Sequence, residues 1–213
     1  MRYQDLMRPR QPTIKENQEG LEVSVEEFAS KDKAMQAFDA DLAPRGILAL
    51  LLKVENNGTQ TYSIDEQAIS VYWDTEILVS IPGEKAASQA ANSEYVGKAL
   101  GWTMLAGPLA PFAWPLTIGG SAAHTASVNK RIEEHFRDMS FNSAVLKPNQ
   151  YAAGFLYFKL PAETKKLESL RVEAIASEKE TGKELRYKLF LPKLDLSRDV
   201  DTSKPSQGNN TQP

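Results

Sequence analysis

Hydrophobic and polar residues alternate with a period of two along several parts of the chain, the pattern of half-buried β-strands. The ranges 21–26 and 69–73 show this alternation most clearly, with Val or Leu at every second position of the first. The range 47–54 is a dense apolar run and predicts a central strand. Further strands are expected over 77–81, 140–146, 154–160, 167–176 and 184–191, the last two forming a hairpin around 178–183. Several short strands at this spacing indicate an antiparallel sandwich.

Turn residues separate these strands. Glu55-Asn56-Asn57-Gly58 predicts a hairpin turn with positive φ angles, followed by a partner strand at 59–64. Lys147-Pro148-Asn149-Gln150 predicts a type I turn with proline at its second position. A short helix is expected over 31–42, because its spacing places Met35, Phe38 and Leu42 on one face.

Three stretches together resemble a known kind of domain. The order ILALLLKVENNGTQTYSIDEQAISVYW, a spacer, AVLKPNQYAAGFLYFKLP and LESLRVEAI resembles the immunoglobulin-like domains of uncharacterised bacterial lipoproteins and secreted proteins. In those domains one strand ends in Val-x-Asn-x-Gly and a later strand follows a Leu-x-Pro-x-x turn. The resemblance covers 21–191 apart from one insertion. It implies a mainly β fold, an antiparallel immunoglobulin-like β-sandwich, in the bacterial periplasm or cell envelope.

The insertion contains the range 99–129, which has no Asp, Glu, Lys or Arg although 25% of the chain is charged. Pro108, Pro111 and Pro115 interrupt the range, and each proline removes a backbone donor, so it cannot be one straight helix.

We therefore expect an apolar α-helical hairpin. Helix formers and small residues predict one helix over 84–106, after Pro82-Gly83, and Pro115 suits the first position of a second helix over 115–137. The connecting turn would be 107–111.

The residues expected to make apolar contacts lie near the apex of this hairpin. They are Trp102, Leu105, Leu109, Phe112, Trp114 and Leu116. Small residues spaced by four let helix backbones approach closely, as in membrane helices. We expect close helix packing at Gly97, Gly101, Gly119 and Gly120.

Four interpretations of the hairpin are open. It covers a face of the sandwich and adds to the core, or its apex enters a membrane shallowly, because each arm offers about half of the roughly 20 apolar residues that a full crossing needs. In the third, hairpins of several subunits pack into a homo-oligomer. One continuous transmembrane helix is disfavoured by the three prolines. The sequence thus predicts a binding or structural protein that contacts membrane, another envelope protein or its own copies. The alternative is a soluble periplasmic scaffold or adaptor with the hairpin in its own core.

The side chains available for catalysis and for metal binding argue against an enzyme. There is no cysteine, and His124 and His135, the two histidines, are not on one helical turn. The adjacent Glu26 and Glu27 are expected to point in different directions, so they do not form a general acid/base pair. Phosphate-binding glycine motifs are absent from the sequence. We expect no catalytic residue, cofactor or metal.

The charge of the chain bears on its partners, and its two polar ends bear on the domain boundaries. The net charge of −3 and the scattered Lys and Arg residues give no basic surface for nucleic acid. The range 1–19 is expected to be an extended tether and 197–213 a disordered tail. The sandwich is expected over 20–83 and 138–196, with the hairpin at 84–137.

The expected location is the periplasm or outer membrane, as a mature lipoprotein without its leader; the alternative is the cytoplasm.

Overall fold

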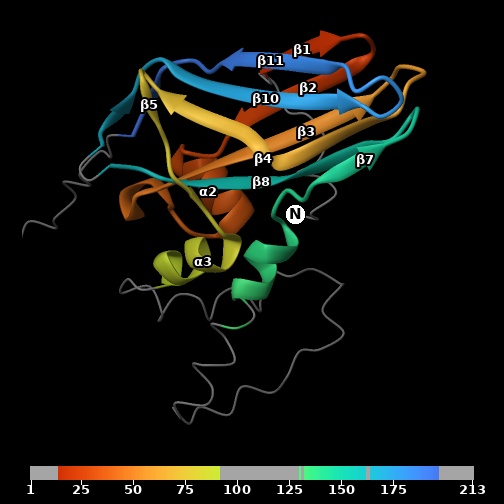
Figure 1. The fold of residues 1–213 in the computed structure, drawn as a ribbon. Helices are drawn as coiled ribbons and strands as arrows, with labels where there is room; N and C mark the ends of the chain where they lie inside the picture. The colour runs from red at the N-terminus through yellow and green to blue at the C-terminus, as the bar shows by residue number, and fades with distance from the viewer. Residues whose placement is uncertain (1–13, 92–129, 131, 162–163, 197–213) are drawn as a thin grey trace, which may run out of the picture.

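The chain is mainly β, with antiparallel sheets and few helices (Figure 1). The computed structural model describes residues 14–91, 130, 132–161 and 164–196. The described strands are β1 (Ile14–Gln18), β2 (Leu21–Glu27), β3 (Ile47–Asn56), β4 (Tyr62–Trp73), β5 (Glu76–Ile77), β6 (Ser80–Ile81), β7 (Ala144–Leu146), β8 (Tyr151–Lys159), β9 (Lys166–Leu167), β10 (Leu170–Glu178), β11 (Glu184–Phe190) and β12 (Leu194–Asp195). The helices are α2 (Lys31–Phe38), the 3₁₀ turn η1 (Ala43–Arg45), α3 (Gly83–Ala91) and a helical segment at 132–138.

Two sheets contain most of these strands. Sheet A has the order β1-β2-β3-β8-β6, and sheet B has the order β11-β10-β4-β5, with β7 also pairing with β4. β9 and β12 form a separate pair. The predicted hairpin of 167–176 and 184–191 is confirmed as β10 and β11, whose pairing ends at Ser177 and Glu184.

The main core lies between the two sheets. Buried and less buried residues alternate strictly along β10 and β11, because one face of sheet B covers the core. The sheets are also joined by a hydrogen bond, in which the Tyr187 hydroxyl of β11 donates to the Leu21 carbonyl oxygen of β2 at 3.0 Å. This bond is buried and lies where β1 and β2 approach β11 (Figure 1).

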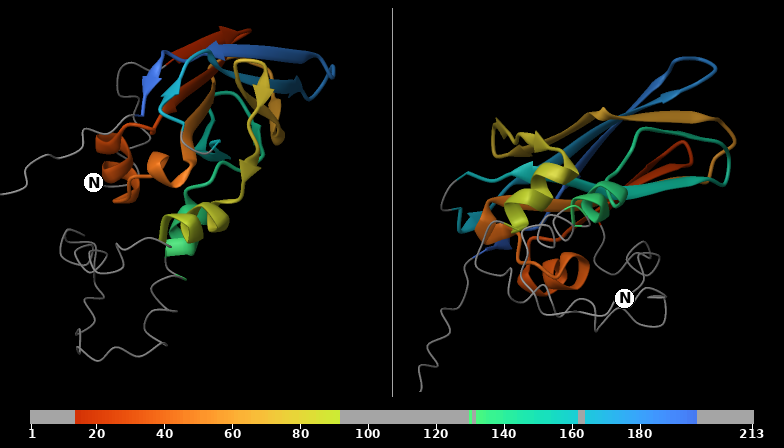
Figure 2. Two further views of the ribbon diagram at one scale, coloured as in Figure 1. Left: turned by 90° about the vertical axis from the view of Figure 1, so that its left-hand side faces the viewer. Right: turned by 90° about the horizontal axis from the view of Figure 1, so that it is seen from below.

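Sheet A is covered on its other face as well. A second core cluster joins α2, α3 and the helical segment 132–138 to β3 and β8, and Phe28, Phe38, Phe136, Phe155 and Tyr157 supply its aromatic rings. Figure 2 shows the helices gathered on this side of sheet A. The alternation in 21–26 predicted a half-buried strand, whereas Ser24 and Glu26 of β2 are buried too.

The predicted hairpin at 55–58 is wrong, because β3 and β4 belong to different sheets. The chain crosses between the sheets here, and the fully buried Asn56 holds the crossing. Its amide donates to the carbonyl oxygens of Gln60 at 2.7 Å and Leu146 at 3.0 Å. Gly58 does not take the expected positive φ; instead its Cα lies against Gly20, whose φ is 84°. A Cβ atom on Gly58 would lie 2.8 Å from the Glu19 carbonyl oxygen, so close backbone approach requires glycine at position 58.

Other local expectations also differ. The strands expected at 59–64 and 69–73 are one strand, β4, which pairs with β10. The predicted helix 31–42 ends at Phe38, because Asp39 takes a left-handed conformation with φ of 47°. Phe38 and Leu42 are buried as expected, but Met35 is 37% exposed.

The turn at 147–150 and the N-terminal boundary need correction too. The backbone N–H of Gln150 donates to the Lys147 carbonyl oxygen at 3.1 Å, which confirms a turn. Asn149 has a φ of 62°, so the turn is type II rather than type I, a conformation that asparagine tolerates. The range expected to be a tether includes β1, which pairs with β2. The expected tail 197–213 lies outside the described residues.

Candidate functional site

The two ends of the predicted hairpin are helical. α3 begins at Gly83, one residue before the predicted start at 84, and the chain is again helical at 132–138. The rest of the predicted hairpin lies outside the described residues. This includes every proposed contact residue and every proposed glycine, namely Trp102, Leu105, Leu109, Phe112, Trp114, Leu116, Gly97, Gly101, Gly119 and Gly120.

The two helical ends lie side by side. A Cβ atom placed on Gly83 would lie 2.8 Å from the carbonyl oxygen of Phe136 and 2.6 Å from the hydroxyl oxygen of Ser140. That Ser140 hydroxyl also donates to the Phe136 carbonyl oxygen at 2.9 Å. We call α3, the helical segment 132–138 and Ser140 the insertion base. The chain therefore enters and leaves the insertion at adjacent points on one side of sheet A.

The inner side of the insertion base belongs to the second core cluster. Ala86, Ala87 and Ala90 of α3 are buried there, which explains the small residues of this helix. The Phe136 ring centroid lies 5.1 Å from that of Phe38 and 5.5 Å from that of Tyr157. Phe136 therefore anchors the returning end of the insertion by aromatic packing, and the buried alanines anchor α3 to the same cluster.

The outer side of the insertion base is polar, so the described part of the hairpin is amphipathic rather than clearly apolar. Lys130 and Glu134 lie within 4.0 Å of each other, one helical turn apart, and Arg137 contacts Asp138 at 3.7 Å. Helices within the described ranges are all too short or too polar to cross a membrane.

His135 is the histidine that the structure describes, and it lies on the insertion base. Desolvation by the surrounding protein lowers the pKa of its imidazole, and the nearby carboxylate of Asp138 partly offsets this. His124 lies outside the described residues. Across the described ranges, His, Asp and Glu side chains form no group of three that could hold a metal ion.

Glu26 and Glu27 converge on one ammonium group, although the sequence suggested that they point apart. Lys33 on α2 contacts Glu26 Oε1 at 3.1 Å and Glu27 Oε1 at 2.9 Å, and it also donates to the Glu27 carbonyl oxygen. Desolvation lowers the pKa of Lys33, but the two carboxylates outweigh it and raise the pKa overall. Glu27 Oε2 also accepts the backbone N–H of Ala29 at 2.8 Å. These contacts fasten the start of α2 to the end of β2.

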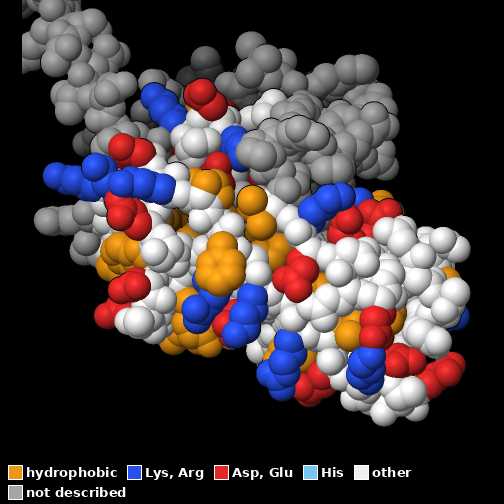
Figure 3. All heavy atoms as spheres, turned by 90° about the horizontal axis from the view of Figure 1, so that it is seen from above, with side chains coloured by type: hydrophobic (Ala, Val, Ile, Leu, Met, Phe, Trp, Pro, Cys, Tyr) orange, Lys and Arg blue, Asp and Glu red, His pale blue; other side chains and the backbone are white. Residues whose placement is uncertain are grey.

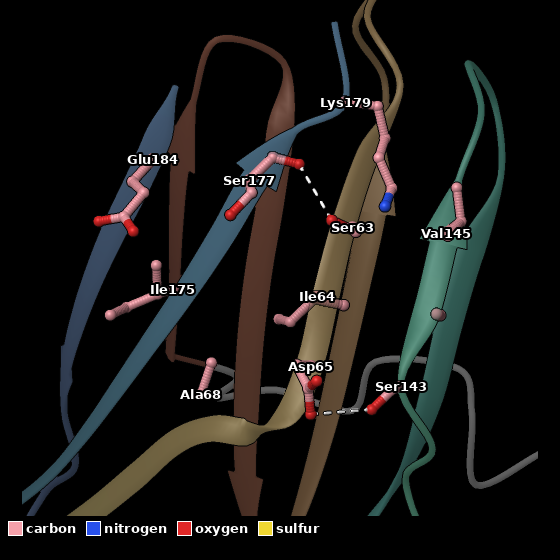
Figure 4. A pocket seen from close by; sticks show the side chains of 11 residues that line it. Ser63, Ile64, Asp65, Ala68, Ser143, Val145, Ile175, Ser177, Lys179 and Glu184 are labelled. Atoms are coloured by element: carbon pink, nitrogen blue, oxygen red, sulfur yellow. Dashed lines mark hydrogen bonds between the residues drawn. The ribbon is translucent and has the colours of Figure 1, made fainter. Parts of the chain in front are cut away.

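An open cavity of about 430 Å³, lined by both polar and apolar side chains, lies on the outer face of sheet B (Figure 4). Its cause is a bulge, because the four β4 residues 65–68 stand opposite the single β10 residue Ile175. Such bulges redirect side chains and interrupt pairing. The sequence signal for this bulge is the run of polar residues at 65–67, which breaks the alternation of β4.

Hydrogen bonds within the cavity join its strands to one another. Ser143 donates to Asp65 Oδ1 at 3.1 Å and accepts the backbone N–H of Glu66 at 3.0 Å. Partial desolvation raises the pKa of Glu66, and the charge of Asp65 raises it further. Figure 4 shows Lys179 reaching over the cavity from the end of β10. This arrangement offers hydrogen bonds to a polar ligand, and His135 lies far from it, beyond sheet A.

Comparison with known proteins finds no matching family model and no matching curated protein. One similar solved structure is a candidate lipoprotein of Bacillus subtilis subsp. subtilis strain 168, with 10% identity and a TM-score of 0.37. The match covers 83% of this chain and 38% of that chain, so this chain spans less than half of the Bacillus protein. Another is a functionally unknown protein of Listeria monocytogenes EGD-e, with 10% identity, a TM-score of 0.34 and coverage of 84% of this chain and 80% of that chain.

Proposed function

We propose that this chain is a non-enzymatic protein of the bacterial cell envelope, in which an immunoglobulin-like β-sandwich displays the uncharged insertion for contact with a membrane. The supporting observation is the insertion base. Gly83 and Phe136 bring both ends of the insertion together, and the second core cluster anchors them. The described residues already form two buried core clusters.

The contact surface is the apolar apex predicted from the sequence, with Trp102, Phe112 and Trp114 at its centre. Tryptophan suits the boundary between lipid headgroups and acyl chains, and phenylalanine is common on the apolar side of segments that lie there. Three prolines within 108–115 favour a shallow apolar tip over a complete span. Self-association through the insertion is the alternative, because its glycines permit close helix packing.

A replacement variant tests this proposal. Residues 101–116 are exchanged for a Gly/Ser segment of the same length, which preserves the reach between the two ends of the insertion. The cooperative melt, the molar mass and co-sedimentation with phosphatidylcholine–phosphatidylglycerol vesicles are then compared with those of the intact chain.

We expect the replacement variant to melt cooperatively and to lose vesicle binding. A loss of the cooperative melt would mean that the apex is core, as in the soluble scaffold alternative. Retained vesicle binding would refute membrane contact through the apex, and a drop from an assembly to a monomer without vesicle binding by either chain would favour self-association.

A further inference from the structure

A continuous row of side chains crosses the outer face of sheet B, exposed at its two ends and half-buried at its centre. Ile77 on β5 pairs with Tyr72 on β4, and Tyr72 pairs with Arg171 on β10. Arg171 in turn pairs with Phe190 on β11. Directly paired residues project from the same face of a sheet, so these four side chains form one line, which we call the exposed row. Figure 3 looks onto this face and shows hydrophobic side chains lying among charged side chains of both signs.

The exposed row has the composition of a protein interface. Its two ends are apolar and open to solvent, with Ile77 58% and Phe190 62% exposed. At its centre the Arg171 guanidinium lies 4.6 Å from the Tyr72 ring centroid. Aromatic residues and arginine are enriched at protein interfaces and dominate their binding energy.

We propose that the exposed row is an interface between two copies of this chain. A two-fold axis parallel to the strands, running between β4 and β10, reverses the order of the row in the second copy. Ile77 then meets Phe190 of the partner subunit, and Tyr72 meets Arg171 of the partner subunit. Each apolar end faces an apolar end, and each cation faces an aromatic ring, so one surface complements itself, as a two-fold interface requires.

Charges beside the exposed row agree with the same pairing. Glu173 lies one row along β10, where Arg171 contacts it at 3.1 Å and Lys188 at 3.7 Å. On β4 the residue paired with Glu173 is Ser70. The two-fold axis therefore places Glu173 opposite Ser70 of the partner subunit, and two carboxylates do not meet. A second copy can therefore pair with this face without placing one Glu173 carboxylate opposite the other. This makes a second copy the favoured occupant of the face.

This interface is separate from the insertion. The insertion base lies on the far side of sheet A, whereas the exposed row lies on the outer face of sheet B (Figures 1 and 2). In the proposed dimer the two insertion bases point in opposite directions. Dimerisation and vesicle binding are thus independent properties. A flat membrane contacts the insertion of only one of the two subunits in a dimer.

Sedimentation velocity over a range of protein concentrations tests the interface. We expect the intact chain to shift from monomer to dimer as its concentration rises, and Phe190→Asp to weaken the dimer by about tenfold or more. Ile77→Lys is a second variant, at the other end of the row. Because Ile77 meets Phe190 of the partner subunit, this substitution should weaken the dimer similarly. Val145→Asp is the matched control, because Val145 is 54% exposed on sheet B but lies outside the row.

The variants are first compared by thermal melting, since exposed positions should leave the fold unchanged. A chain that stays monomeric at the highest concentration overturns the proposal, as does a dimer that Val145→Asp weakens as strongly as Phe190→Asp. A dimer that survives Phe190→Asp but disappears when 101–116 are replaced also overturns it and assigns self-association to the insertion. Failure of vesicle binding alone bears on the proposed function and leaves the dimer interface standing.

Discussion

Gly83, the first residue of α3, lies directly against the backbone of Phe136 on the returning helical segment. The position that a Cβ atom would take is 2.8 Å from the Phe136 carbonyl oxygen, closer than real Cβ atoms approach. This contact sets the two ends of the insertion next to each other, and it makes the absence of a side chain at position 83 a structural requirement.

Gly83→Ala should therefore destabilise the folded chain by about 1 to 3 kcal/mol, the usual cost of overpacking. Urea unfolding followed by circular dichroism measures this change. The control is Lys85→Ala in the same helix, where an exposed side chain is removed and little change is expected. An unchanged midpoint for Gly83→Ala would show that the two ends separate without cost.

Tyr187→Phe should destabilise the chain by about 1 to 2 kcal/mol, because it removes the buried hydrogen bond to the Leu21 carbonyl oxygen between the two sheets. The matched control is Tyr151→Phe, since Tyr151 is 62% exposed. Equal stabilities of the two variants in urea would contradict a structural role for the bond between the sheets.

The same tyrosine predicts an alkaline loss of stability. Burial, with smaller contributions from Tyr62 and nearby carboxylates, raises the pKa of Tyr187 well above its ordinary value of about 10. The unfolded chain then loses this proton at a lower pH than the folded chain, so the stabilisation is complete below pH 10 and declines above it. The stability difference between the intact chain and Tyr187→Phe should shrink as the pH rises above 10. A difference that stays constant up to the alkaline unfolding transition would contradict the raised pKa.

Lys33→Met should destabilise the chain by about 1 to 3 kcal/mol, because it leaves the buried Glu26 carboxylate without its partner. Adding Glu26→Gln to this variant removes the unpaired charge and should restore part of the loss. A double-mutant cycle measured by urea unfolding gives the coupling energy. Purely additive effects would show that Lys33 and Glu26 do not interact in the folded chain.

Asn56→Asp replaces an amide donor by an acceptor of the same shape. Because Asn56 donates to two carbonyl oxygens in a fully buried position, the substitution should cost about 2 to 4 kcal/mol. Asn57→Asp, at the next position on the exposed side of the crossing, is the control and should change the melting temperature little. A similar change in both variants would argue against the role of Asn56.

The strands were largely predictable from the sequence because each local pattern reports burial on one or two faces. The arrangement of the strands was not, since the Asn56-Asn57-Gly58 signal specifies a change of direction and leaves open whether the chain returns to the same sheet. The sequence did not predict the burial of Glu26, because that burial depends on an ion pair with Lys33, and Lys33 lies on a separate element, α2. The small residues of α3 pack in the second core cluster, a partner that the sequence pattern alone does not identify. The apex residues and glycines predicted for 92–129 stay predictions.

Co-sedimentation with phosphatidylcholine–phosphatidylglycerol vesicles tests the central claim most directly. The variant carries Trp102→Ser, Phe112→Ser and Trp114→Ser together, and its control carries Trp102→Phe and Trp114→Phe, which keep the apex apolar. The proposal predicts that the intact chain and the control bind vesicles and that the serine variant remains in the supernatant with an unchanged melt. Equal binding by all three proteins, or binding by none of them, would contradict membrane contact through the insertion.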